Sequence, residues 1–171
     1  MARYRPTEAD LAQRLAKSGY AFDDETVPDR IRILLEMCQR DLTAARVLLD
    51  DPSGVLGDQA LQHLEEVGMR LGEALAFGLG YRLEDNSAGY HRRAIAVLID
   101  YAAVHMPAAA AGAREFDRIR RERSSVKYPD DLLDYEPTTD ADARRWLTTA
   151  TAVFTAISPE PMRQYRQRHG R

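Results

Sequence analysis

The chain has almost no cysteine: Cys38 is the single one among 171 residues. An intrachain disulfide and a cysteine-rich zinc site are therefore both excluded, and such sparing use of cysteine fits a reducing compartment. We expect a cytoplasmic protein. Cys38 lies among the leucines of an apolar helical face, and we interpret it as inert core packing.

Long apolar runs and a positive net charge are absent as well. No apolar stretch approaches the roughly 20 residues of a membrane span, and the first residues lack the apolar centre of a signal peptide, so we expect no membrane partner. The net charge is −3, so any contact with nucleic acid must come from a local basic patch. The length suits one domain with a sizeable core.

Several motifs that carry chemistry are missing. The sequence has no Gly-rich phosphate loop and no GxSxG elbow. The segment His63–Glu66 lacks the second histidine of a zinc-protease helix, so we interpret His63 as an exposed helical residue. The acidic segment 130–137 lacks the glycine and the closing glutamate of a calcium loop. We predict no metal site and no cofactor.

Apolar residues recur at steps of three and four along most of the chain, and no stretch alternates with period two over the length of a strand. This pattern predicts an all-α fold: an antiparallel bundle of four to five helices plus a short N-terminal helix. The expected helices cover 7–17, 28–49, 56–79, 86–106 including its cap, 116–128 and 139–157. Thr7 and Asp10 are expected to form a capping box for the first helix, Thr139 to cap the last, and Pro159 and Pro161 to end it. We divide the chain into an N-terminal helix and linker (1–27), the bundle (28–158) and a basic C-terminal tail (159–171).

Two glycines, Gly68 and Gly72, interrupt the helix expected at 56–79. Each costs about 1 kcal/mol relative to alanine inside a helix, so we expect a compensating close approach, either by a neighbouring helix or by a second subunit. This ridge is one reason to predict a homodimer. Gly80 is instead expected to cap the end of the helix.

The segment Phe116–Tyr128 is the one chemically distinctive stretch. At helical spacing Arg123 projects into the apolar arc formed by Phe116 and Ile119, where its donors need partners because a buried unpaired charge costs several kcal/mol. The candidate residues for binding nucleic acid or phosphate are Arg118, Arg120, Arg121, Arg123, Ser124 and Lys127. The alternative is an ordinary solvated helix, whose arginines pair with Glu115, Asp117 and Glu122.

Three segments resemble the HEPN superfamily in their order and spacing: Asp41–Leu49, Glu73–Gly80 followed by Gly89–His91, and above all Phe116–Tyr128. The similarity covers roughly residues 28–157. It implies a helical bundle that usually dimerises. In active members of the superfamily, an arginine followed after four residues by histidine forms a composite, metal-independent ribonuclease site in the dimer cleft.

This sequence departs from that motif at its last position. Arg123 is present, Ser124 stands where asparagine often follows, and Tyr128 replaces the histidine. A phenol with a pKa near 10 is a poor general base at neutral pH, where an imidazole is a good one. The resemblance therefore implies a domain that binds RNA, a nucleotide or a partner protein through the helix Arg118–Tyr128 without cleavage.

Two other functions stay open. The first is a metal-independent endoribonuclease of toxin–antitoxin or defence type, with an antitoxin or a nucleotidyltransferase as partner. For this function the motif can also be aligned from Arg121 instead of Arg123. In some family toxins the arginine is followed after four residues by histidine and, one residue later, by a tyrosine that partner enzymes modify. Counted from Arg121, Val126 takes the histidine position and Tyr128 the tyrosine position. We prefer the register of Arg123, which lies at the apolar interface. The second function is a non-catalytic interaction module.

His91 is the last candidate. A short link, 107–113, joins its helix to the basic helix, which favours an antiparallel hairpin in which His91 lies within roughly 8 Å of Arg123 or Tyr128. We therefore group His91, Arg123 and Tyr128 as catalytic candidates. The alternative is a core histidine that holds a carbonyl or a carboxylate.

Overall fold

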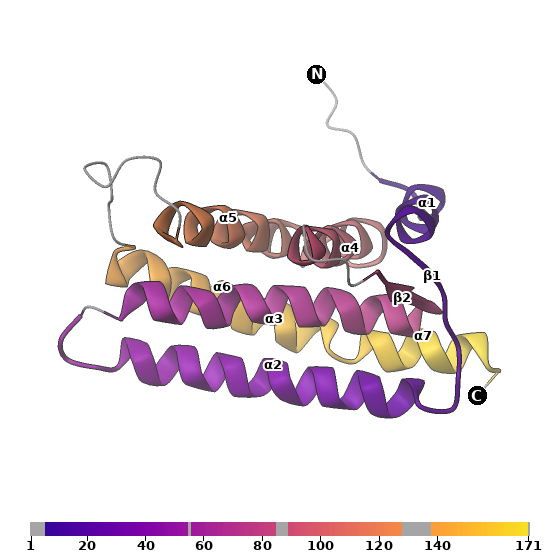
Figure 1. Cartoon of the computed structure of the whole chain (residues 1–171), viewed down its shortest axis with the longest axis horizontal. Coiled ribbons are helices and arrows are strands. Elements are labelled where there is room, and N and C mark those ends of the chain that lie inside the picture. Colours follow the sequence, from indigo (N-terminus) through magenta and orange to yellow (C-terminus); the bar gives the residue numbers. More distant parts are fainter. Residues whose placement is uncertain (1–5, 55, 85–88, 128–137, 171) are drawn as a thin grey trace, which may run out of the picture.

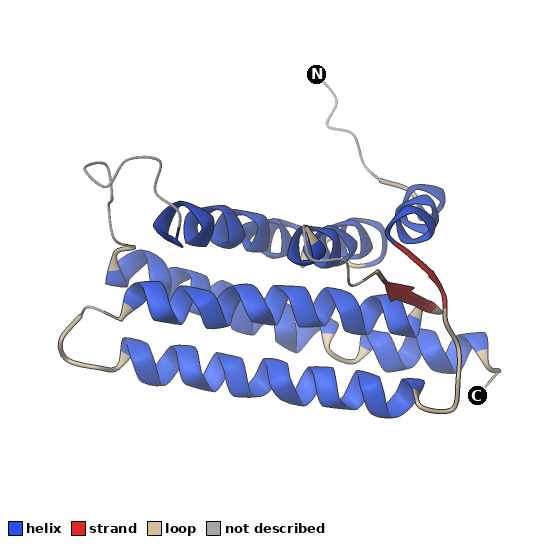
Figure 2. Cartoon of the chain, viewed as in Figure 1, coloured by secondary structure: helices blue, strands red, loops and turns tan. Residues whose placement is uncertain are grey.

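The structure is a computed structural model; it describes residues 6–54, 56–84, 89–127 and 138–170, and of residues 125–127 it describes the backbone only. Most of it is helical, as Figure 2 shows, so the all-α prediction is confirmed. The elements in chain order are α1 (Glu8–Ser18), β1 (Gly19–Ala21), α2 (Val27–Leu49), α3 (Gly57–Gly78), β2 (Tyr81–Leu83), α4 (Tyr90–His105), α5 (Ala110–Lys127), α6 (Asp140–Ile157) and α7 (Glu160–Arg168).

Helix α3 runs through the middle of the bundle. It packs against α2, α4, α5, α6 and α7, and most of its residues are buried. In Figure 1, α2 lies below α3, and α4 and α5 lie above it. A polar side chain on the inner positions of α3 must therefore find its partners inside the protein.

The glycine ridge of α3 lies against other helices of the same chain. A methyl group on Gly68 would overlap the ring of Phe116 on α5, and one on Gly72 would overlap the backbone carbonyl of Ala94 on α4. Of the two predicted explanations, close approach by a neighbouring helix is the one observed. A second subunit cannot occupy the same ridge.

The N-terminal helix belongs to the bundle. Thr7 and Asp10 form the expected capping box of α1, and Leu11 and Leu15 are buried in the main core. The following residues form β1, which pairs antiparallel with β2, Gly19 opposite Leu83. The sequence pattern predicted neither strand, because segments of three residues are too short to show an alternation of apolar and polar residues.

Most of the predicted basic tail, 159–171, forms the helix α7. Tyr165 packs in a small core cluster with Val27, Ile31 and Phe77. The prolines after α6 suggested a stop, but proline is also tolerated in the first turn of a helix, as it is here in α7.

Helix α5 begins earlier than predicted, at Ala110, because the alanine-rich stretch that we expected to be a connection continues as helix. Thr139 caps α6 as predicted, with its hydroxyl accepting from the backbone N–H of Asp142 at 3.1 Å. The cap expected at Asn86–Ser87 and the acidic segment 130–137 lie outside the described residues. No helix within the described ranges has the length and apolar character that crossing a membrane requires.

Replacing Gly72 by alanine (Gly72→Ala) should lower the free energy of unfolding by about 1–3 kcal/mol, in spite of the better helix propensity. The added methyl meets backbone of α4, which cannot move aside as a side chain can. Urea denaturation measures the decrease. The control is Gln62→Ala at an exposed position of the same helix, which should change stability by less than about 0.5 kcal/mol. Equal stability of Gly72→Ala and the wild type would contradict the close approach.

Candidate functional site

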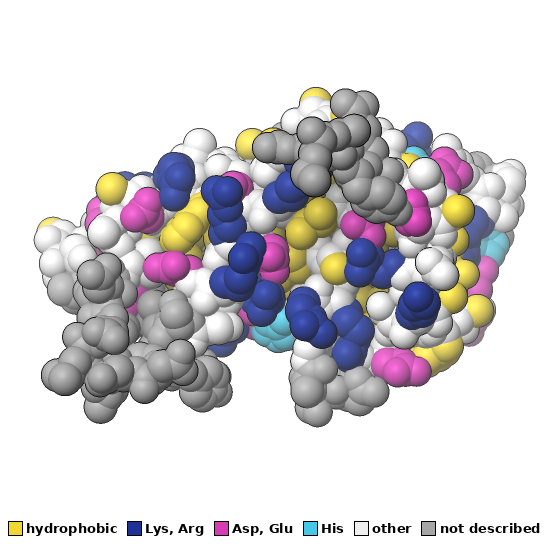
Figure 3. Space-filling model, turned by 90° about the horizontal axis from the view of Figure 1, so that it is seen from above, with side chains coloured by type: hydrophobic (Ala, Val, Ile, Leu, Met, Phe, Trp, Pro, Cys, Tyr) yellow, Lys and Arg dark blue, Asp and Glu magenta, His cyan; other side chains and the backbone are white. Residues whose placement is uncertain are grey.

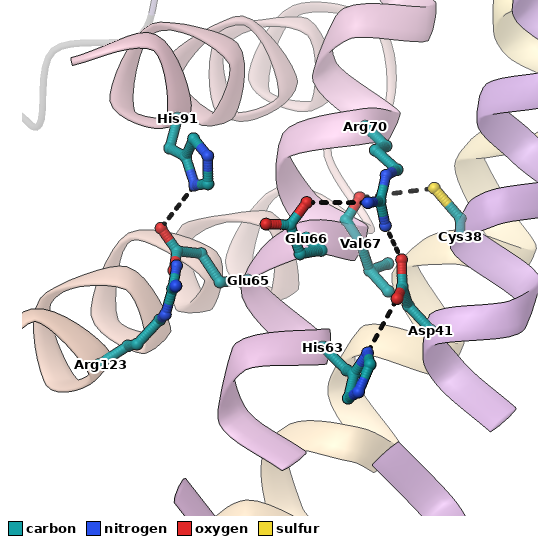
Figure 4. Close-up of polar contacts among 9 residues, drawn as sticks. All are labelled: Cys38, Asp41, His63, Glu65, Glu66, Val67, Arg70, His91 and Arg123. Carbon is teal, nitrogen blue, oxygen red and sulfur yellow. Dashed lines mark hydrogen bonds and ion pairs between the residues drawn. The ribbon is translucent and has the colours of Figure 1, made fainter. Parts of the chain in front are cut away.

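A buried carboxylate organises the candidate site. Glu65 lies on α3 and is only 4% exposed. A buried charge is tolerated when it is paired and hydrogen-bonded. One carboxylate oxygen of Glu65 accepts a hydrogen bond from Nδ1 of His91 at 2.9 Å, and the other accepts from Nη1 of Arg123. Figure 4 shows both side chains converging on Glu65 from α4 and α5.

Arg123 lies where its helical position predicts. The inner face of α5 buries Phe116 and Ile119, and the side chain of Arg123 follows on that face with 20% of its surface exposed. Glu65 supplies the partner that a guanidinium at an apolar interface needs.

His91 stands in the first turn of α4, and its side chain is 36% exposed. An ionised carboxylate only accepts, so Nδ1 of His91 carries the hydrogen and Nε2 is left for solvent or a ligand. The structure thus brings His91 and Arg123 together on one carboxylate. Both sequence-based descriptions of His91 apply: it lies beside Arg123, and it holds a carboxylate.

The hydrogen bond between His91 and Glu65 shifts the protonation of both partners. It raises the pKa of His91 above its ordinary value of 6.5, although partial burial of the ring acts in the opposite direction. Burial alone would raise the pKa of the Glu65 carboxyl, but the hydrogen bonds from His91 and Arg123 outweigh it and lower the pKa below 4.5. The hydrogen bond thereby favours the protonated imidazole more than in a free histidine.

The other arginines of α5 form pairs along their own helix. Arg118 pairs with Glu115 at 3.0 Å, Arg120 with Asp117 at 3.0 Å, and Arg121 with Asp117 at 2.8 Å. The alternative of a solvated helix describes Arg118 and Arg121, whereas Arg120 is only 22% exposed and Arg123 reaches across to α3.

Of the remaining predicted residues, Ser124 forms no contact with the cluster around Glu65 among the described hydrogen bonds. The hydroxyl of Ser124 donates to the backbone carbonyl of Arg120 at 2.9 Å, one turn back along α5. Tyr128 lies outside the described residues, and so does the side chain of Lys127.

A second polar cluster lies on the other side of α3. Asp41 of α2 binds Nδ1 of His63 at 2.9 Å and also binds Arg70, which pairs in turn with Glu66 at 3.0 Å (Figure 4). His63 was predicted to be an exposed helical residue; it is partly exposed and paired with Asp41. Among the described residues, no group of three or more His, Cys, Asp or Glu side chains could hold a metal ion.

Cys38 is fully buried, and its thiol lies 3.6 Å from the carbonyl oxygen of Val67. Burial raises its pKa to about 12, so the reactive thiolate is disfavoured. The thiol packs as an inert side chain, as predicted.

Glu65, the residue on which the cluster depends, was not among the candidates predicted from the sequence. A signal was available: Glu65 precedes Gly68 and Gly72 by three and seven residues, which puts a charged side chain on the same helical face as the glycine ridge. A charge on a face reserved for close helix contact predicts partners on the approaching helices.

In an NMR titration, the pKa of His91 should lie above 6.5 in the wild type and fall in Glu65→Gln, because the amide is a weaker acceptor than the carboxylate. Glu66→Gln changes the neighbouring carboxylate, to which the imidazole is not hydrogen-bonded, and should shift the pKa less. An equal shift in both variants would contradict the assignment.

The raised pKa of His91 also makes the stability of the protein depend on pH. Because the folded-state pKa is raised, the charge of protonated His91 contributes its full extra stability below about pH 6.5, and this extra stability is lost as the pH rises through the folded-state pKa. His91→Gln should therefore destabilise the protein more at about pH 5.5 than at about pH 9, as urea denaturation at the two pH values can measure.

Comparison with known proteins adds no relative. No family model matches the chain, and no curated protein or solved structure shows significant similarity to it.

Proposed function

We propose that this chain is a HEPN-like helical domain that binds RNA or a nucleotide through α5 and does not cleave it. One observation carries the proposal: two cationic groups, Arg123 and His91, converge at the surface on a single buried carboxylate. With His91 protonated, Glu65 offsets one of the two positive charges, and the remaining charge is available to a phosphate.

Exposed arginines on the outer face of α5 add to this positive charge. The side chains of Arg118 and Arg121 are each 64% exposed. Their ion pairs with carboxylates of the same helix are worth only about 0–1 kcal/mol, so a phosphate group can replace them. Figure 3 views the face that carries α5, α4 and α1, and it shows Lys and Arg side chains gathered across its middle.

The absence of cleavage in this proposal depends on Tyr128, which stands where active HEPN members have histidine and which is a poor general base at neutral pH. The resemblance also supports a homodimer, a partner protein of antitoxin type and a cytoplasmic location as parts of the proposal. The glycine ridge no longer supports the dimer, because α4 and α5 cover it within the chain.

Removing cationic side chains from α5 should weaken RNA binding in a salt-dependent way. For Arg118→Ala/Arg121→Ala, the slope of log K against log salt should become shallower by about one unit for each phosphate that is no longer bound. The matched control is Arg118→Ala/Arg40→Ala, which removes the same charge but places one change on α2, on the far side of α3 from α5 (Figure 1). Fluorescence anisotropy at several salt concentrations provides both slopes.

If the wild type shows no salt-dependent affinity for RNA, or if both double variants keep the wild-type slope, the binding proposal is wrong and a non-catalytic interaction module remains.

The arrangement of His91 favours one other function, a metal-independent endoribonuclease. The 2′-hydroxyl of the ribose would attack the phosphorus and lose its proton to solvent, while the P–O5′ bond breaks. Nδ1 of His91 is held by Glu65, so the protonated imidazole can donate from Nε2 to the leaving O5′. Arg123 lies on the same carboxylate and can stabilise the negative charge that develops on the phosphate. His91 would then supply the acid that the motif lacks at Tyr128.

Incubation with labelled RNA in EDTA separates the two functions. The binding proposal predicts intact RNA under conditions where the wild type is saturated. The ribonuclease predicts cleavage that His91→Asn lowers by about 100-fold or more while RNA affinity stays within a few-fold of wild type. Cleavage that survives His91→Asn unchanged would exclude His91 as the acid and indicate a contaminating nuclease or another residue.

A further inference from the structure

A cavity of about 420 Å³ lies between α1, α4 and the start of α5, away from the cluster around Glu65. Basic side chains enter it from two helices: Arg14 and Lys17 from α1, and Arg114 from α5. Helix α4 contributes Ile99 and Ala103, which form an apolar wall. None of these residues was predicted from the sequence to form a site, because they come together only when α1 docks on α4.

The two acidic residues in this cavity already have partners. Asp100 accepts a hydrogen bond from Nε of Arg14. Asp10 accepts from the backbone N–H and the hydroxyl of Thr7, at 2.8 and 2.7 Å, in the capping box of α1.

Two of the cations have no such partner. Within the part of the chain that the structure describes, the side chains of Lys17 and Arg114 form no ion pair and no hydrogen bond. Both residues are exposed. Arg14 also lines the cavity; it pairs with Asp100 through Nε, and its side chain is 43% exposed. The cavity therefore carries positive charge in excess of its acids.

We propose that this cavity binds a terminal phosphate, with the group that bears the phosphate lying against Ile99 and Ala103. A phosphomonoester carries up to two negative charges and several acceptor oxygens, which suits one lysine and two guanidinium groups. The volume falls in the range of about 300–1,000 Å³ that is usual for small-ligand sites. An apolar wall beside a cationic end matches a nucleoside monophosphate better than inorganic phosphate.

Two sources share this chemistry: a free nucleoside monophosphate and the phosphorylated end of an RNA strand. The second source extends the proposed function and rests on it. Arg114, Arg118 and Arg121 follow one another at steps of four and three, so they share a face of α5. At 1.5 Å per residue, Arg114 and Arg121 are about 10 Å apart along the helix axis, a span of a few nucleotides. An RNA end in the cavity would place the following nucleotides along α5.

Isothermal titration with AMP and with adenosine tests the cavity by itself. The wild type should bind AMP at least about tenfold more tightly than adenosine, because hydrogen bonds to a charged group are worth about 1.5–3 kcal/mol. Lys17→Gln and Arg114→Gln should each weaken AMP binding by about tenfold. The matched control Arg118→Gln, one turn further along α5 and outside the cavity lining, should bind AMP like the wild type.

Neither Lys17→Gln nor Arg114→Gln removes a described hydrogen bond or ion pair, and circular dichroism and urea denaturation should show a wild-type fold. The proposal is overturned if AMP and adenosine bind equally, or if both variants keep the wild-type affinity for AMP.

Two RNAs of one sequence, with a 5′-phosphate or a 5′-hydroxyl, then separate the sources. A preference of the wild type for the 5′-phosphate that disappears in Arg114→Gln supports an RNA end. AMP binding without such a preference supports a free nucleotide in the same cavity. These experiments also test the cavity and the α5 surface separately. If Arg118→Ala/Arg121→Ala leaves RNA binding unchanged while AMP still binds through Arg114, RNA binding through α5 is wrong and phosphate binding in the cavity is supported.

Discussion

The central helix of the bundle carries a carboxylate into the interior, where it has to be neutralised. Glu65 is buried on α3, and removing a partner from a buried ion pair is among the more costly changes that a protein can suffer. Its two oxygens bind side chains from two different helices, His91 of α4 and Arg123 of α5. The charge that α3 carries inward therefore fixes how both helices lie against it.

Glycine makes this arrangement sterically possible. Gly68 and Gly72 have no side chain, so Phe116 of α5 and the backbone of α4 at Ala94 pack directly against the backbone of α3. Each glycine costs about 1 kcal/mol of helix propensity, and the close packing compensates for it. The same close approach lets side chains from α4 and α5 reach Glu65, so the packing and the polar cluster depend on one another.

Positive charge on the face of α5, α4 and α1 comes from side chains in different electrostatic situations. Arg118 and Arg121 are exposed and held by weak pairs within their own helix, while Arg123 is tied to α3. Lys17 and Arg114 border a cavity whose acids are already engaged. A chain with a net charge of −3 thus presents a locally basic surface, because its acids are directed into caps, pairs and the interior.

The sequence by itself determined the class of fold and most helix limits, because apolar periodicity and capping residues such as Thr7 and Thr139 act locally. It also placed Arg123 at an interface and His91 beside it. Tertiary structure decided what local patterns do not contain. Glu65 is the partner that His91 and Arg123 share, and helices of the same chain cover the glycine ridge. The segment after Pro159 forms α7, in which Tyr165 packs beside Phe77. Such contacts join residues distant in sequence, and their energies depend on which helices meet, so composition and spacing along one segment do not reveal them.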